Sequence, residues 1–203
     1  MATEAETTVK RGSGRMTGPE RRSVIIQATI DVVAEHGVQG ATTARIASAS
    51  GISEKTLYSH FPSRRDMLIA ALDAVFERAM VVVRERQDPN PIEHLRIAAQ
   101  RHWPMEREFV HPLYEFFASS PQEDLRRELR VRHQAHVMVV AGIIDEGKAQ
   151  GVVRPEVDSE QAAWEFYAVF WAEDIAFMIG FDDFGTSGRS VLMIERMLRE
   201  ISA

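Results

Sequence analysis

The sequence contains no cysteine, which excludes disulfide bonds, thiolate metal sites and cysteine nucleophiles. It has no run of about 18 uncharged apolar residues and no apolar signal-peptide core near its N-terminus, so neither a membrane partner nor secretion is expected. With 45% hydrophobic and 27% charged residues, the 203-residue chain has the composition of a globular protein. Together these features predict a cytoplasmic protein.

Motifs for catalysis are also missing. There is no Gly-rich phosphate loop, no nucleophile elbow and no His-Glu-x-x-His zinc signature, so we expect no enzyme. Two pairs of potential metal ligands have helical spacing, His133 with His136 and Glu108 with His111. Further ligands at suitable spacing are lacking, so we expect neither a metal site nor a cofactor.

The net charge of −6 is unevenly distributed along the chain. Residues 10–65 contain nine basic and four acidic residues, which leaves the rest of the chain strongly acidic. Affinity for DNA comes largely from basic side chains that neutralise phosphates. The distribution therefore predicts an N-terminal module that binds double-stranded DNA and a body that does not.

The spacing of apolar residues predicts an all-α fold. Residues 1–17 have no apolar period and should form a flexible tail; residues 18–65 should form a three-helix DNA-binding domain, and residues 66–203 a larger helical domain. The first helix should stop at Gly37, and Pro104 should stop a later one; the helix after it should be kinked or divided at Pro112. In the larger domain we expect helices at about 64–83, 92–103, 105–118, 123–150, 158–179 and 187–201, the first two separated by the break at 88–91.

Residues 43–60 have the spacing of a helix-turn-helix. Ala47 supplies a small residue where two short helices cross, and Gly51 supplies the positive φ that the tight turn requires. We expect Thr43 and Ser53 to cap the two helices. The small core beneath them should consist of Ile46, Ile52 and Leu57.

The outward face of the second helix in this unit is polar. A helix of its length fits the major groove, where its first residues reach base edges and its flanks contact phosphates. Lys55 and Thr56 are expected to contact bases, whereas the role of the neighbouring Glu54 stays open. Further DNA contacts, mainly to phosphates, are expected from Thr42, Thr43, Arg45, Tyr58, Ser59, His60 and Arg64.

The segments TTARIA at 42–47, GIS at 51–53 and TLYSHFPSR at 56–64 resemble the DNA-binding domain of the tetracycline-repressor (TetR) family. The resemblance spans about residues 20–70, and the segment at 146–154 is similar more loosely. Arg64 stands where the family most often has lysine, and Arg65 where an acidic residue is common. The resemblance implies a bacterial homodimer joined through the last two helices of each subunit. It further implies a repressor that a small-molecule ligand releases from a palindromic operator.

Aromatic and histidine side chains of the larger domain either fill its core, line a pocket for the unidentified small-molecule effector, or face the partner subunit. Pockets for small molecules are mostly apolar with a few polar groups, so the same side chains can serve more than one role. The candidates for the ligand pocket are Trp103, Phe109, Phe116, Phe117, His133, His136, Phe170 and Trp171.

The sequence therefore predicts a sequence-specific transcriptional regulator. The main alternative is an architectural protein that binds DNA without regard to sequence, and a more remote one is an enzyme on a helical scaffold. The acidic body argues against broad coating of DNA, because phosphates would repel it.

Overall fold

The computed structural model describes residues 16–106, 110–119, 123–181 and 183–203, so most of the expected tail lies outside these ranges. Within them the chain is helical, apart from one isolated bridge between Val153 and Ser202. The all-α prediction is confirmed. The helices are α1 (Gly18–Gly40), α2 (Thr43–Ser50), α3 (Glu54–His60), α4 (Arg64–Arg84), α5 (Pro91–Glu106), α6 (Val110–Ala118), α7 (Glu123–Ala149), α8 (Ser159–Met178), α9 (Asp183–Thr186) and α10 (Arg189–Ile201).

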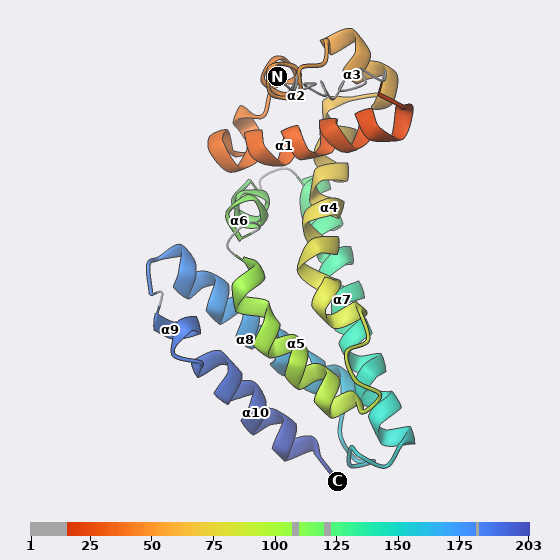
Figure 1. Cartoon of the computed structure of the whole chain (residues 1–203), viewed down its shortest axis with the longest axis vertical. Helices are drawn as coiled ribbons and strands as arrows, with labels where there is room; N and C mark the ends of the chain where they lie inside the picture. Colours follow the sequence, from red (N-terminus) through yellow and green to blue (C-terminus); the bar gives the residue numbers. More distant parts are fainter. Residues whose placement is uncertain (1–15, 107–109, 120–122, 182) are drawn as a thin grey trace, which may run out of the picture.

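The molecule is elongated, with a small head at one end of its long axis and the C-terminus near the other (Figure 1). The head consists of α1, α2 and α3. Helix α4 runs from the head into the body, where it packs against α5 and α7, and α6 lies between α1 and the rest of the body. The body is completed by α8 and α10, which pack against each other.

Local sequence signals set the ends of the head helices. Helix α1 begins at a capping box formed by Thr17 and Glu20, and its regular part ends at Gly37, which has a φ of 68°. Gly51 ends α2 with a φ of 65°, and Ser53 caps α3 by accepting a hydrogen bond from the N–H of Thr56. The expected roles of Gly37, Gly51 and Ser53 are confirmed.

The predicted cap of α2 was wrong by one residue. The hydroxyl of Thr42, rather than that of Thr43, accepts the N–H of Arg45, with a nitrogen-to-oxygen distance of 3.3 Å. Either threonine has the chemistry of a cap, and the cap belongs to the residue with extended backbone angles that precedes the first helical one. Thr42 has a φ of −73° and a ψ of 155°, so it takes that role.

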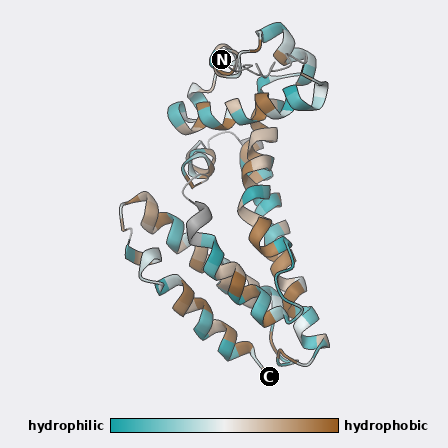
Figure 2. Ribbon diagram, viewed as in Figure 1, coloured by the Kyte–Doolittle hydropathy of each residue, from teal (hydrophilic) through white to brown (hydrophobic). Residues whose placement is uncertain are grey.

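Helix α4 contributes to three apolar cores and so joins the head to the body. Met67 packs in the head core with Leu57 and Phe61. Further along the helix, Leu72 and Phe76 pack in a second core that contains the other face of α1 together with residues of α6 and α7. The last turns of α4 pack in the body core, and hydrophobic residues follow the helix along its length (Figure 2). The expected domain boundary between residues 65 and 66 lies in the first turn of this shared helix.

The helices near the two prolines differ from the prediction. Helix α5 continues through Pro104 to Glu106, although a proline at this position removes one intrahelical hydrogen bond. The preceding turns are held by the buried Leu95 and Ala99. The following helix is undivided from Val110 to Ala118, so Pro112 lies in its first turn, where a proline is tolerated. The loop expected before the last helix contains the short helix α9.

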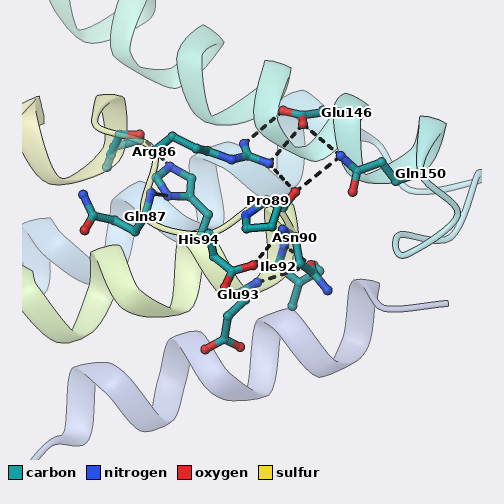
Figure 3. A network of polar contacts seen from close by, with 11 residues as sticks. Arg86, Gln87, Pro89, Asn90, Ile92, Glu93, His94, Glu146 and Gln150 are labelled. Atoms are coloured by element: carbon teal, nitrogen blue, oxygen red, sulfur yellow. Dashed lines mark hydrogen bonds and ion pairs between the residues drawn. The ribbon is translucent and has the colours of Figure 1, made fainter.

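The turn between α4 and α5 is attached to α7 by side chains (Figure 3). The two Nη atoms of Arg86 donate to the two carboxylate oxygens of Glu146, each at 3.0 Å. The buried His94 accepts the N–H of Gln87 at Nδ1 and contacts the carbonyl of Val83 through Nε2 at 2.7 Å. Helix α4 ends at Arg84 and α5 begins at Pro91, which confirms the break expected at residues 88–91. The side-chain bonds fix the C-terminal end of α4 to the body.

Candidate nucleic-acid surface and candidate ligand site

Helix α3 presents a polar face outward from the head. Its inward residue Leu57 is fully buried, whereas Lys55 and Ser59 are exposed and Tyr58 is 48% exposed. Thr56 and His60 are half-buried at the margins of this face. The polar surface expected for contact with DNA therefore exists, although which side chains contact bases stays a prediction.

Helix α3 is held against α2 by a side-chain hydrogen bond. The hydroxyl of Thr43 donates to Oε2 of Glu54 with an oxygen-to-oxygen distance of 2.9 Å. Glu54 also lies in the first turn of α3, where the helix dipole favours a negative charge. Glu54, whose role the sequence left open, therefore joins α3 to α2 through its contact with Thr43.

Arg22 of α1 supports the other end of α3, a role that sequence reasoning missed. Its Nη1 donates to the carbonyl of His60 at 3.0 Å, and its guanidinium lies 4.0 Å from the centre of the Phe61 ring. The last carbonyls of a helix have no intrahelical partner, so this bond satisfies one of them. The contact joins residues 38 positions apart, which no local pattern in the sequence reveals.

Arg45 and Arg64 both bond to backbone carbonyls where α1 meets α2. Nε of Arg64 donates to the carbonyl of Ala41 at 2.6 Å, and its Nη2 donates to that of Val38. Nη1 of Arg45 donates to the carbonyl of Gly40 at 2.8 Å. This geometry gives both arginines a structural role in the head, while the phosphate contacts expected of them stay predictions.

Replacing Arg64 with alanine tests that structural role. The substitution removes the side-chain donors from the carbonyls of Val38 and Ala41. The Val38 carbonyl keeps the N–H of Ala41 at 3.4 Å, whereas the carbonyl of the buried Ala41 loses the donor. We expect the free energy of unfolding to fall by about 1–3 kcal/mol, because buried polar groups without a partner keep their desolvation penalty. Urea denaturation followed by circular dichroism measures this change. Lys55→Ala, at an exposed position of the same head, is the control, and its free energy of unfolding should stay within about 0.5 kcal/mol of the native value. Equal decreases in the two variants would contradict the structural role of Arg64.

The body contains a small, partly open cavity of about 50 Å³. Residues of α4, α5, α6, α7 and α8 line it: Ala79, Met80, Val82, Val83, His102, Val110, Leu113, His133, Val140, Phe166, Tyr167, Phe170, Trp171 and Asp174. A larger and more open groove of about 680 Å³ adjoins it between α6, α7 and α8. His133 and Trp171 line both spaces, so these two side chains stand between the cavity and the groove.

The residues expected in a ligand pocket divide into three groups. His133, Phe170 and Trp171 line the cavity, and Phe117 lines the groove. Phe116 does not line either space, because it is fully buried in the core beneath α1, and His136 is buried behind Tyr167. The side chain of Trp103 and the whole of Phe109 lie outside the described residues. Sequence reasoning missed His102 and Asp174, polar residues that the fold brings to the cavity wall.

Burial keeps the two histidines of α7 neutral at pH 7. His136 is 2% exposed, and desolvation together with nearby positive charges lowers its pKa to about 3. Its Nδ1 lies 3.0 Å from the hydroxyl of Tyr167. Desolvation also lowers the pKa of His133. In the part of the chain that the structure describes, no group of three or more His, Asp or Glu side chains is placed to hold a metal ion.

The buried His136 predicts a decrease of stability in acid. Its pKa is lower in the folded chain than the ordinary value of 6.5, so below about pH 6.5 the unfolded chain binds the proton first. We expect the free energy of unfolding to decrease as the pH falls from 6.5 toward 3, by up to about 1.4 kcal/mol per pH unit for this one proton. Urea denaturation at a series of pH values, with His136→Asn beside the native chain, measures the slope. The surface control His36→Asn should leave the slope unchanged. If His136→Asn also leaves it unchanged, another group is responsible for the pH dependence.

The head and the cavity define a class of protein: a helix-turn-helix module joined through one long helix to an α-helical body with an internal cavity. Residues 25–71 match the family model of bacterial regulatory proteins of the tetR family. Residues 25–71 thus match the tetR family, as the resemblance implied, and the whole chain shares the fold of a TetR-family structure. Among the described residues, no helix has the length and apolar character needed to span a membrane.

Curated relatives of 30% identity or more match over about a third of the chain. The nucleoid occlusion factor SlmA of Marinobacter nauticus is 38% identical over 74 residues, which cover 34% of this chain and 38% of the relative. The transcriptional repressor KstR of Rhodococcus jostii is 30% identical over 78 residues, covering 38% of this chain and 37% of the relative. The chain therefore matches well under half of the length of either protein.

Solved structures match over nearly the whole chain. A TetR-family transcriptional regulator of Cytophaga hutchinsonii has a TM-score of 0.76 at 17% identity, covering 94% of this chain and 99% of the other. GusR of Salmonella enterica has a TM-score of 0.76 at 20% identity, covering 92% and 96%. At these identities the likeness establishes the fold and does not extend to ligands or operators.

Proposed function

We propose that this protein is a homodimeric transcriptional regulator that binds a palindromic DNA operator through α3 and releases it when a small molecule binds in the body. The observation that carries the proposal is the exposed polar face of α3, with Lys55, Tyr58 and Ser59 directed outward. Thr43, Glu54 and Arg22 hold that helix at both ends, so it would enter a major groove as a preformed unit.

Exposed apolar side chains on α8 and α10 support a dimer. Ile175 is exposed near the end of α8, Ile179 follows it directly after the helix, and Leu192 is 67% exposed on α10. Exposed apolar residues on neighbouring elements are typical of an interface between subunits. Pairing of α8 and α10 across a two-fold axis would place two copies of α3 at one end of the assembly, and the half-sites of the operator would lie roughly 34–36 Å apart.

Helix α4 provides the connection through which a ligand would act on the head. Met80 and Val83 near its C-terminal end line the cavity, and Met67 near its N-terminal end packs in the head core. A ligand that binds better when α4 is in one of two positions would shift the equilibrium toward that position, by the difference between its affinities for the two states. The separation of the two heads in the dimer would change with the position of α4. Reciprocity then requires DNA to weaken binding of the ligand by the same factor.

Selection of bound fragments from a random DNA pool tests the regulatory function. We expect enrichment of a palindrome, because two identical heads related by two-fold symmetry recognise identical half-sites. Binding without enrichment of any sequence would instead support an architectural role, which the likeness of the head to a nucleoid occlusion factor keeps as the second candidate. Absence of DNA binding altogether would overturn both.

A further inference from the structure

The groove beside the cavity has a wall of aromatic rings from three helices. The ring centres of Phe117 on α6 and His133 on α7 lie 5.2 Å apart, and those of His133 and Trp171 on α8 lie 5.4 Å apart. The ring centre of Trp171 lies 6.0 Å from that of Trp164, and all four side chains line the groove. A continuous surface of rings binds an apolar body, because contact with it removes apolar area from water.

Arg130 of α7 brings a positive charge to this groove. It is exposed and precedes Gln134 by one turn, so the two side chains share a face of the helix, and both line the groove. On the same helix, Arg127 and Arg132 each pair with Glu128. Among the residues that the structure describes, no ion pair joins Arg130 to a carboxylate. Its guanidinium can therefore accept an anion without giving up an existing ion pair.

The other described side chains of the groove do not balance this charge. Tyr114 and Gln134 are polar and uncharged at pH 7, and burial lowers the pKa of His133, so that this side chain is neutral as well. The carboxylate of Asp174 belongs to the wall of the inner cavity rather than to that of the groove. The described wall of the groove therefore has one positive charge, carried by Arg130, on an otherwise apolar surface.

The groove combines the size and the chemistry of a site for an acidic ligand. Its volume of about 680 Å³ is that of a site for a drug-sized molecule. A guanidinium binds a carboxylate through two parallel hydrogen bonds, and the amide nitrogen of Gln134 can donate a further one to the same head group. With the head group at Arg130, the rest of the ligand would extend over the rings of Trp164 and Trp171.

We propose that the effector of this site is an organic acid, with its anionic head group beside Arg130 and Gln134 and an aromatic or apolar body on the rings of the groove. An amine in the same place would be repelled by Arg130, and an uncharged molecule would leave the guanidinium without a partner. The inference rests on the proposed function in that it takes the groove as the effector site, and it adds the chemical class of the effector.

Three probes of one shape and different charge test the inference: 4-phenylbutanoate, 4-phenylbutanamide and 4-phenylbutylammonium. Their binding to the full chain is measured by calorimetry at pH 7.5. We expect the acid to bind about ten-fold more tightly than the amide, as one charge-assisted contact provides, and the ammonium probe to bind most weakly. Equal affinities for acid and amide, or a preference for the ammonium probe, would overturn the proposal. Absence of binding by all three would overturn it too, as expected if a second subunit fills the groove.

Matched variants locate the head group. Arg130→Gln keeps a polar side chain and removes its charge, so the affinity for the acid should fall about ten-fold, to that for the amide, while the amide binds as before. Arg127→Gln removes a positive charge from an exposed position of the same helix that lines neither space, and it should retain the preference for the acid. A preference that survives Arg130→Gln, or that both variants reduce equally, contradicts the assignment.

The same probes separate this inference from the proposed function. Each is added to the complex of the protein with its selected operator in a gel-shift assay. Binding of the acid that depends on Arg130 but leaves the operator bound would support the ligand class and contradict release by ligand. Release by the amide or the ammonium probe, with no effect of the acid, would support release and overturn the ligand class.

Discussion

Phe76→Ala should lower the free energy of unfolding by about 3–5 kcal/mol, the usual cost of truncating a buried phenylalanine. Phe76 is 3% exposed on α4 and packs in the core that joins α1, α6 and α7. Its ring centre lies 4.9 Å from that of His133 and 5.1 Å from that of His136. The side chain therefore links the helix that leaves the head to the helix that lines the cavity, and its removal leaves a void between them. Urea denaturation followed by circular dichroism measures the change.

Phe76→Leu separates packing from coupling. Leucine restores most of the apolar volume, so the cost should fall below that of alanine, to about 1–2 kcal/mol. Neither variant keeps the aromatic ring that packs against the two histidine rings. If α4 transmits the effect of a ligand through these rings, Phe76→Leu should bind its operator normally and respond less to the effector. A leucine variant as unstable as the alanine variant would indicate that ring shape, rather than volume, holds the core.

Elements of the head that depend on neighbouring residues could be predicted from the sequence. The turn at Gly51 and the cap at Ser53 follow from local backbone chemistry, and both are confirmed. The buried Ile46 and Leu57 follow from the spacing of the helix-turn-helix. The cap of α2 was misplaced because adjacent Thr42 and Thr43 have the same chemistry, and only the backbone angles distinguish them.

Interactions between distant residues could not be predicted, because they depend on how the helices cross. Glu54 meets Thr43 only once α2 and α3 are packed, and Arg22 reaches the end of α3 from another helix. The same limit applied to the cavity: Phe116 and Phe117 are neighbours in sequence, yet one lies in a core and the other lines the groove. Asp174 belongs to a helix that also contains Glu160, Glu165 and Glu173, so nothing local in the sequence distinguished it as a residue of the cavity wall.

Lys55→Ala should weaken binding to the selected operator by about 5- to 100-fold, the range for removing one side chain that recognises a base edge. Lys55 is exposed in the first turn of α3, the part of a recognition helix that reaches the bases. The free energy of unfolding should be nearly unchanged, since the exposed side chain belongs to none of the apolar cores. Fluorescence anisotropy with labelled operator, at several salt concentrations, measures the affinity.

The control is Arg154→Ala, which also removes one positive charge, from an exposed position in the loop between α7 and α8. Because this loop belongs to the body and lies outside both the head and the exposed apolar residues assigned to the dimer interface, this variant should bind DNA as the native chain does. If Lys55 contacts a base, its replacement should spare binding to unrelated DNA. If it instead neutralises a phosphate, affinity should fall evenly for all sequences, and the slope of log affinity against log salt should decrease by about 1. An operator affinity that does not change in Lys55→Ala would exclude this side chain from the interface, since the exposed start of α3 would then lie outside the groove.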